Sequence, residues 1–153
     1  MNARSAFLLA TTLLFSSCGD DTDPIDPEVF AGPSSPVQVR VDRYGIAHID
    51  AANATDAHFA SGYVQASTRL FQMDEMRRRA LGRRAEVWPD EAEDDVLMRT
   101  LDFPRLGAEN AERTRREAPR SHGYVVAWTA GVNRFIDEVM AGTQALPTGF
   151  GAE

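Results

Sequence analysis

The side chains that could carry out catalysis or bind a metal are few and widely spaced. His48, His58 and His122 have no cysteine, second histidine or acid at the spacing of zinc ligands, so we expect no zinc site. The chain has no Gly-x-Ser-x-Gly motif, and a Ser-His-Asp triad would have to be assembled from residues without a local signature. From these motifs alone we expect no catalytic residue, no metal ligand and no cofactor-binding residue.

The basic side chains exclude several further kinds of chemistry. All 16 basic residues are arginine, and the chain has no lysine. Schiff-base catalysis, the phosphate-binding P-loop and the Ser-x-x-Lys acylation motif all need an amine side chain. We therefore do not expect a nucleotide triphosphate hydrolase.

Charged residues cluster between positions 74 and 95, where arginines could bind phosphate. Acids surround these arginines, and Asp74–Arg78 and Glu75–Arg79 are acid-before-base pairs four residues apart. We expect a solvated ion-pair face and no nucleic-acid partner. The acidic run lacks the spacing and central glycine of an EF-hand, which favours a charged surface loop. The arginines are Arg77, Arg78, Arg79, Arg83 and Arg84, and the acids are Asp74, Glu75, Glu86 and the run Asp90–Asp95.

The single cysteine, Cys18, follows a pattern typical of export. Arg4, the apolar stretch Ala6–Phe15 and two small serines precede it, which predicts a signal peptide over residues 1–17. Ten helical residues span about 15 Å, roughly half a bilayer's hydrocarbon thickness, which disfavours a permanent transmembrane helix. The pattern resembles a bacterial lipoprotein signal, although Phe15 stands where leucine is usual. We predict lipidation at Cys18; ordinary cleavage and a retained apolar tail stay open.

Lipidation would place the protein in the bacterial cell envelope, lipid-anchored or periplasmic, with the membrane as a partner through Cys18. A lone thiol in an exported protein cannot form an internal disulfide, which favours this interpretation. Residues 18–36 are predicted to be an acidic, proline-rich tether, since they hold four of the eight prolines and five acids. Residues 37–153 have a net charge of only −3 and are expected to form one modest folded region.

The folded region is predicted to begin with a β-hairpin. Valines alternate with polar residues over residues 37–41, which predicts a strand with one buried face. The dipeptide Tyr44-Gly45 is a turn signal, and residues 46–49 are predicted to form the returning strand.

A long helix should follow the hairpin. Asn53 offers an N-cap with Asp56 three residues later, and the helix should run to about Leu81 with Gly82 as its stop. Its apolar residues recur at helical spacing and predict one buried stripe. That stripe comprises Phe59, Tyr63, Ala66, Leu70, Met73 and Met76.

Further helices are predicted downstream. The acidic run is expected to be a loop with an acidic helix start, and a polar helix should run from Pro104 until Pro119 closes it. Ser121 is predicted to cap a last helix, in which Trp128 and Phe135 are core residues rather than part of a cofactor site. The apolar face of this helix comprises Tyr124, Trp128, Val132, Phe135, Ile136 and Val139.

Separated blocks of the sequence closely resemble the start of the small (α) chain of the penicillin acylase family. Their order and spacing match that family from Val37 to about Phe150, which is more specific than any single motif. Ala47 stands where the family usually has proline, which should loosen the hairpin, and Thr68 stands where aspartate is usual. The blocks are Val39–Ile49 with Asp56–Met73, Arg78–Val87, and Ala130–Ile136.

The resemblance implies an N-terminal-nucleophile hydrolase, in which one precursor cuts itself into a small and a large chain. The nucleophile in that family is a serine at the new N-terminus of the large chain, activated by its own α-amine. Backbone N–H groups and an asparagine side chain hold the oxyanion, and the large chain usually binds calcium. The resemblance places all of these groups outside this chain, so it implies no catalytic, cofactor or metal residue here.

The implied fold class is an α+β fragment: an N-terminal β-hairpin plus several helices, part of an αββα sandwich. The apolar stripes of the two long helices would need a partner surface, and the resemblance assigns much of that surface to the large chain. We expect the isolated chain to be the inactive N-terminal part of an exported amidohydrolase, cut short before its catalytic chain. That large chain would be its partner.

The implied reaction is hydrolysis of a linear amide C–N bond, which releases an acyl group from a β-lactam nucleus, a homoserine lactone or a similar amine. A second hypothesis stays open, in which the chain is a non-catalytic envelope lipoprotein that binds a partner. A precursor junction in the same reading frame, or its absence, distinguishes the two.

Overall fold

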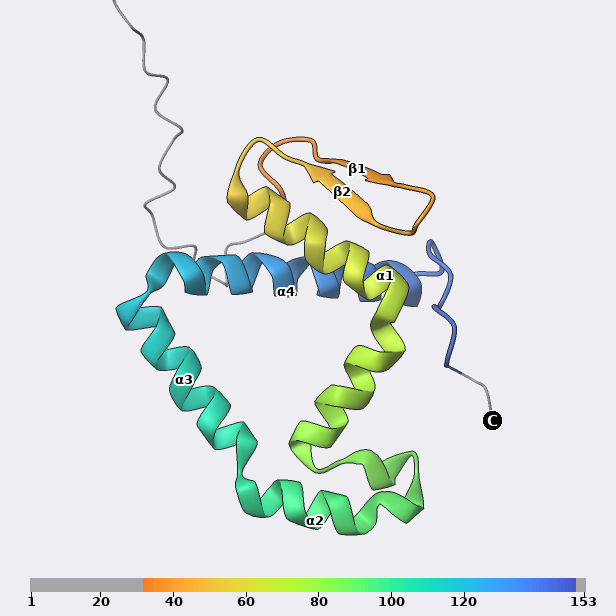
Figure 1. Ribbon diagram of the computed structural model, residues 1–153, viewed down its shortest axis with the longest axis vertical. Helices are drawn as coiled ribbons and strands as arrows, with labels where there is room; N and C mark the ends of the chain where they lie inside the picture. The colour runs from red at the N-terminus through yellow and green to blue at the C-terminus, as the bar shows by residue number, and fades with distance from the viewer. Residues whose placement is uncertain (1–31, 151–153) are drawn as a thin grey trace, which may run out of the picture.

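The computed structural model describes residues 32–150 as a two-stranded hairpin followed by four α-helices (Figure 1). The predicted signal peptide, Cys18 and the tether up to residue 31 lie outside the described residues. The elements follow in the order β1, β2, α1, two short 3-10 helices, α2, α3 and α4. A mostly helical chain with an antiparallel hairpin agrees with the expected α+β fragment.

The hairpin forms where the sequence predicts it. Strand β1 (Gln38–Val41) pairs antiparallel with β2 (Ala47–Asp50). The Asp42 carboxylate holds the turn between them, because it accepts the backbone N–H of Tyr44 at 2.9 Å and of Ile46 at 3.0 Å. These bonds define the turn with alanine at position 47.

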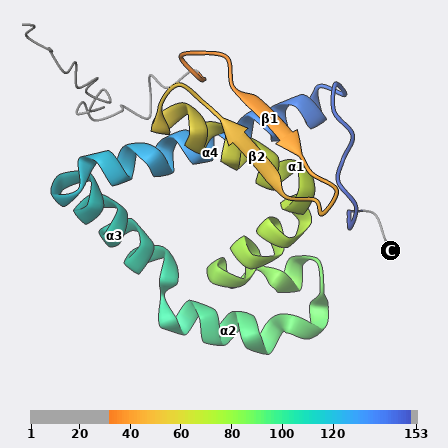
Figure 2. The same ribbon diagram turned by 45° about the horizontal axis from the view of Figure 1, so that its top comes forward.

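The prediction that one face of the first strand is buried is wrong. Every residue of β1 is exposed, with Val39 at 40% and Val41 at 65%. Strand β2 contacts α1, and β1 forms the other edge of the two-stranded sheet (Figure 2). Within residues 32–150 the sheet has no third strand, and the contact with α1 on β2 leaves the valines of β1 largely uncovered.

Helix α1 (Ala54–Leu81) begins and ends at the predicted caps. The Asn53 side chain accepts the backbone N–H of Asp56 at 2.8 Å. Gly82 ends the helix with a left-handed φ of 61°, a conformation that glycine adopts without steric cost.

The sequence does not predict the kink of α1 at Arg69, where φ is −138°. The hydroxyls of Ser67 and Thr68 donate to the Val64 carbonyl at 2.9 and 3.0 Å, and such bonds back to the preceding turn bend helices. An aspartate carboxylate at position 68 could not donate this bond. Beyond the kink Met76 is 61% exposed, so its predicted place on the buried stripe is wrong.

Three further helices complete the chain. The acidic run forms the second 3-10 helix and the first turn of α2, close to the predicted loop and helix start. The prediction that Ser121 caps the last helix is wrong, since α4 already begins at Pro119, which needs no N–H partner there. The elements are η1 (Arg84–Glu86), η2 (Pro89–Glu91), α2 (Ala92–Leu101), α3 (Phe103–Glu117) and α4 (Pro119–Met140).

Small residues allow α1 and α4 to cross closely. Ala66 and Ala127 are fully buried, with no exposed surface. A Cβ added at Gly131 would overlap the carbonyl oxygen of Phe59, and one added at Gly62 would overlap the backbone of α4. The crossing therefore depends on residues that have almost no side chain.

The predicted stripes of α1 and α4 pack against each other at this crossing. The buried core consists of Ala66 from α1 with Val132 and Phe135 from α4. The expectation that both stripes need a surface from another chain is therefore wrong at the crossing itself. The partly buried residues around the core are Tyr63, Leu70, Met73, Trp128, Ile136 and Val139.

Away from the crossing the helices are weakly covered. The second half of α1, then α2, α3 and α4, run around the edges of an open frame (Figures 1 and 2). No residue of α3 is buried. None of the helices in residues 32–150 has the length and apolarity that crossing a membrane requires. The exposed apolar residues of α2 and α3 are Val96, Leu97, Leu101, Phe103 and Leu106.

Candidate functional site

The three histidines lie on separate elements. His48 of β2 hydrogen-bonds the Asp42 carboxylate at 3.1 Å on the surface, and this bond is the main reason that the pKa of Asp42 is lowered. His58 stacks on Tyr124 with ring centroids 4.6 Å apart, and His122 lies within α4. Across the described part of the chain, no three His, Cys, Asp or Glu side chains gather where they could hold a metal ion.

The arginine cluster forms ion pairs, as predicted. Arg78 lies 2.7 Å from Asp74, which confirms the predicted pair four residues apart. Both side chains of this pair are partly buried, at 24% and 26% exposed. The other contacts include Arg77–Asp74 at 2.7 Å, Arg78–Glu86 at 3.0 Å and Arg83–Glu86 at 2.6 Å.

The second predicted pair, Glu75–Arg79, is wrong. Glu75 instead pairs with Arg84 at 3.1 Å, and Arg79 pairs with Asp94 at 3.2 Å. The chain reverses after Gly82 and brings η1 and α2 beside the end of α1. Partners distant in sequence therefore replace the local one.

Arg84 lies at the centre of this network and is less solvated than the sequence predicts. Its side chain is only 18% exposed, and its guanidinium lies 3.1 Å from Glu75 and 2.8 Å from Glu91. The same group lies 5.7 Å from the centroid of the Trp88 ring. The guanidinium therefore links α1 to both 3-10 helices, and the neighbouring carboxylates oppose binding of a phosphate.

A buried carboxylate on α2 stabilises the chain reversal after Gly82. Asp95 of α2 is 3% exposed and accepts the backbone N–H groups of Arg84 and Ala85, both at 2.9 Å. Burial by itself would raise the pKa of Asp95, but these hydrogen bonds outweigh it and the pKa is lowered. Arg99 adds a bond to the Gly82 carbonyl at 2.8 Å.

Asp56 is a second buried carboxylate that joins the start of the described chain to α1. It is 1% exposed, and its oxygens accept the N–H of Ser34 at 2.8 Å and of Ser35 at 3.1 Å. The Ser34 hydroxyl and the Asn53 amide also donate to it, at 2.9 and 3.0 Å. The sequence identifies Asn53 and Asp56 as a helix cap but carries no local signal for the two serines.

Replacing Asp56 with asparagine should destabilise the fold by about 2 kcal/mol or more at pH 7, because two backbone N–H groups lose a charged acceptor. Burial alone would raise the pKa of Asp56, but the hydrogen bonds from Ser34, Ser35 and Asn53 outweigh it and lower the pKa. The stabilisation should therefore be complete above the unfolded pKa near 3.9 and be lost as the pH falls through the folded value.

Amide hydrogen exchange of Ser34, Ser35 and the first turn of α1, followed in both forms between pH 3 and 8, measures this difference, with the exposed Asp50→Asn as the matched control. An Asp56→Asn variant that is as stable as the wild type at pH 7 would contradict the structural role of the carboxylate.

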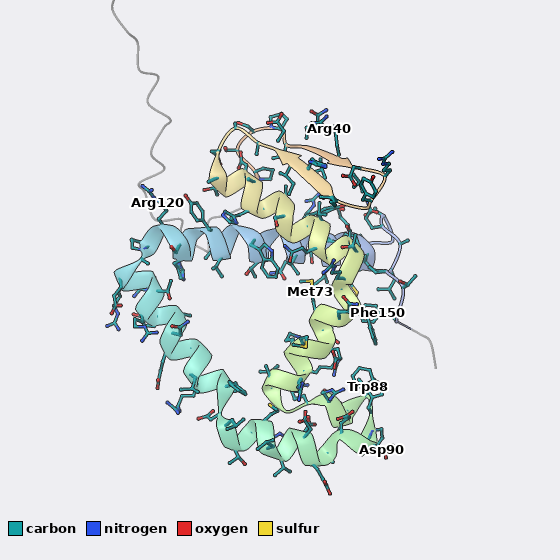
Figure 3. All side chains as sticks on the ribbon, viewed as in Figure 1. Arg40, Met73, Trp88, Asp90, Arg120 and Phe150 are labelled. Atoms are coloured by element: carbon teal, nitrogen blue, oxygen red, sulfur yellow. The ribbon has the colours of Figure 1, made fainter. Side chains whose placement is uncertain are left out.

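An apolar groove of about 510 Å³ lies between the second half of α1 and α4. Figure 3 labels Met73 where α1 passes α4. The α1 residues that line it all follow the kink at Arg69. Its apolar lining is Leu70, Met73, Met76, Trp128, Val132 and Ile136, and its polar lining is Asp74, Arg77, Thr129 and Asn133.

The segment after α4 returns to α1 through aromatic contacts. The Phe71 ring meets those of Trp88 and Phe150 edge to face, with centroids 6.1 and 5.3 Å apart. Gly149 passes so close that an added Cβ would lie 2.7 Å from the Phe71 ring. Figure 3 shows Trp88 and Phe150 beside the second half of α1. These contacts join three segments that are distant in sequence.

The described residues thus form a helical scaffold that presents an apolar groove, and their titratable side chains are mostly engaged in structural bonds. A family model described as penicillin amidase matches residues 36–152, which include the hairpin and all four α-helices. The chain belongs to the penicillin amidase family.

Curated relatives agree with this family. The chain is 43% identical over 114 residues to the penicillin acylase 2 proenzyme of Pseudomonas sp. (strain SE83), covering 69% of this chain and 13% of the relative. It is 38% identical over 106 residues to an acyl-homoserine lactone acylase of Pseudomonas aeruginosa, covering 69% and 12%. The penicillin G acylase of Escherichia coli is 30% identical over 122 residues, covering 78% and 14%. The chain thus spans between about an eighth and a seventh of these relatives.

Proposed function

We propose that this chain is the N-terminal part of the small chain of an exported penicillin-acylase-type amidohydrolase. The observation that carries the proposal is the family match over residues 36–152, together with relatives that are all named as acylases. The catalytic large chain of the same precursor is its proposed partner. The relatives' length supports this partner, because most of each relative lies outside the matched segment.

The proposed chemistry takes place on the large chain. There the N-terminal serine hydroxyl attacks the amide carbonyl, and the serine's own α-amine accepts the proton and returns it to the leaving amine. Water then cleaves the acyl-serine ester, which releases the carboxylic acid and frees the serine. An α-amine has a pKa of about 7.7 to 8, so a useful fraction is unprotonated near neutrality. We assign the calcium that the family usually binds to the large chain, as the resemblance implies.

The role of this chain is to complete the structure around that site. The exposed valine face of β1 and its free strand edge are suited to joining the larger sheet of an αββα sandwich. A two-stranded hairpin is at best marginally stable by itself, which supports a role as part of a wider sheet.

The proposed substrates are linear amides whose acyl group is released from a β-lactam nucleus, a homoserine lactone or a similar amine. The names of the relatives include both penicillin acylases and acyl-homoserine lactone acylases. These names support an amide substrate and do not select one acyl or amine group.

The test is amide hydrolysis with and without a large chain. The purified chain alone should not hydrolyse phenylacetyl, glutaryl or long-chain acyl amides above the buffer rate, because the proposed nucleophile and oxyanion donors belong to the large chain. Activity should appear on co-expression with the unmatched part of the Pseudomonas sp. (strain SE83) proenzyme. Turnover by the chain alone that survives repeated purification would contradict the proposal.

The alternative is a non-catalytic envelope lipoprotein that uses the apolar groove to bind a partner. The groove favours this alternative only if it is filled by a protein other than an acylase chain. Failure of the large chain to associate, together with a stable monomeric fold, would support it.

We also propose that Cys18 is lipidated and anchors the protein to the cell envelope. The wild-type protein should partition into detergent, and Cys18→Ser should release it or block its maturation. Because the chain has no lysine, its N-terminus carries its only primary amine, so an N-acylated Cys18 would leave no site for amine labelling. Mass spectrometry of the N-terminal peptide checks the result, and an unmodified mature N-terminus elsewhere would refute lipidation.

A further inference from the structure

The turn of the β-hairpin exposes apolar and basic side chains together. Tyr44 is 71% exposed and Ile46 is 56% exposed, although both side chains gain from leaving water. Arg43 is exposed beside them, and its guanidinium lies 4.7 Å from the centroid of the Tyr44 ring. We call Arg43, Tyr44 and Ile46 the hairpin tip. A tyrosine, an aliphatic side chain and an arginine at one tip are suited to the interface between a membrane and water.

We infer that the hairpin tip inserts into the surface of an anionic lipid bilayer and gives the protein a second membrane contact beside the lipid on Cys18. This inference rests on the proposed lipidation of Cys18, which brings the chain to the membrane. It adds which end of the folded region faces the membrane and which residues touch it.

The attachment of the chain to α1 places the hairpin at the membrane end of the molecule. Asp56 accepts the backbone N–H groups of Ser34 and Ser35, so the chain that comes from Cys18 joins the folded region at the start of α1. Cys18 precedes Ser34 by 16 residues, a separation that covalent geometry limits to about 55 Å. Strand β1 begins at Gln38, directly after this attachment, whereas α2 lies at the opposite end of the molecule (Figure 1).

The distribution of charge favours the same orientation. Residues 38–49 hold two arginines and one acid, whereas the whole chain has a net charge of −7. That acid is Asp42, whose carboxylate accepts two backbone N–H groups of the turn and hydrogen-bonds His48. Figure 3 labels Arg40 at the hairpin end and Asp90, the first residue of the acidic run, at the α2 end. An anionic bilayer attracts the first end and repels the second.

The hairpin tip can bind a membrane while the strands belong to a wider sheet. Its residues lie between Val41, where β1 ends, and Ala47, where β2 begins, so a further strand paired with β1 leaves them free. Two apolar side chains alone give a weak contact with a bilayer. The lipid on Cys18 makes this second contact intramolecular and raises its effective concentration, so a weak contact suffices.

The lone cysteine allows a test that does not depend on lipidation in the cell. The proposed mature chain, which begins at Cys18, is alkylated there with a single acyl chain of myristoyl length, which by itself gives only marginal and reversible membrane binding. Co-sedimentation with vesicles of phosphatidylethanolamine and phosphatidylglycerol then measures the added contact. Ile46→Ser should weaken vesicle binding about tenfold, because an aliphatic side chain is lost from the interface.

Two further variants separate insertion of the hairpin tip from general adhesion to lipid. Leu97→Ser is the matched control, because Leu97 is an isomer of isoleucine, is 52% exposed and lies on α2. It should leave vesicle binding unchanged. Arg43→Gln should weaken binding to the anionic vesicles about fivefold and have little effect on vesicles of phosphatidylcholine. Circular dichroism checks that each variant folds as the wild type does.

The outcomes separate this inference from the proposed lipidation. Equal binding of the wild type and Ile46→Ser would overturn the hairpin tip as a membrane contact. An equal loss of binding in Leu97→Ser would also overturn it, because apolar surface would then bind lipid without regard to position. Binding of the alkylated chain that depends on Ile46, combined with an unmodified Cys18 in cells, would support the contact and contradict the proposed lipidation.

Discussion

Replacing Gly131 with alanine should separate α1 from α4 and remove the core of this chain. The added Cβ would overlap the Phe59 carbonyl oxygen and lie 2.9 Å from the Tyr63 nitrogen. Both atoms belong to the backbone of α1, so neither can move aside as a flexible side chain could. Overpacking typically costs 1 to 3 kcal/mol, and a backbone clash at a crossing of two glycines should cost about 3 kcal/mol or more.

Amide hydrogen exchange and far-ultraviolet circular dichroism measure this effect. Protection of the α1 and α4 amides around the crossing should be lost in Gly131→Ala, and Gly62→Ala should behave in the same way. Gly107→Ala is the matched control, because Gly107 lies inside α3 with open space around it. Alanine there should be neutral or stabilise by up to about 1 kcal/mol. Unchanged protection in Gly131→Ala would show that the helices do not cross as described.

The parts of the fold that depend on neighbouring residues are predictable from the sequence. Asn53 and Gly82 mark the two ends of α1, because a cap needs only a side-chain acceptor at one end and a left-handed residue at the other. The hairpin strands are likewise marked by alternating valines and a turn. The family is also predictable, since its blocks of sequence are long and ordered.

The parts that depend on distant residues are not predictable in this way. Glu75 pairs with Arg84 instead of the predicted Arg79 because the chain reverses after Gly82. The spacing of residues within one helix does not encode this reversal. The kink at Arg69 depends on hydroxyl bonds that serine and threonine make only in some helices. The groove is lined by residues of α1 and α4, which are distant in sequence, so the periodicity of one helix does not predict it.

The helix crossing did leave a signal in the sequence. Gly62 and Ala66 on α1, and Ala127 and Gly131 on α4, are small residues four apart. Residues at this spacing share one face of a helix, so each pair marks a face that can approach another helix closely. The apolar periodicity of a helix does not reveal such a face, because glycine contributes no side chain to it.

The isolated chain should be loosely packed, rich in helix and prone to aggregate. Among residues 32–150 the buried apolar side chains larger than alanine are Val132 and Phe135. Fully burying one such side chain is worth roughly 1.5 to 3 kcal/mol, and a typical domain has a net stability of about 5 to 15 kcal/mol. The α1–α4 crossing therefore supplies too small a core to hold α2, α3 and the hairpin in fixed positions.

Thermal unfolding of monomeric residues 37–153 should accordingly be broad, with strong binding of a hydrophobic dye and poorly dispersed side-chain NMR signals. The exposed apolar residues of α2 and α3 and the groove supply the surface that the dye would bind. Co-expression with a large chain should reduce dye binding and sharpen the transition, because the same surface becomes interior. A sharp two-state melt of the isolated chain, with dispersed signals and no dye binding, would refute the prediction and favour the independent binding module.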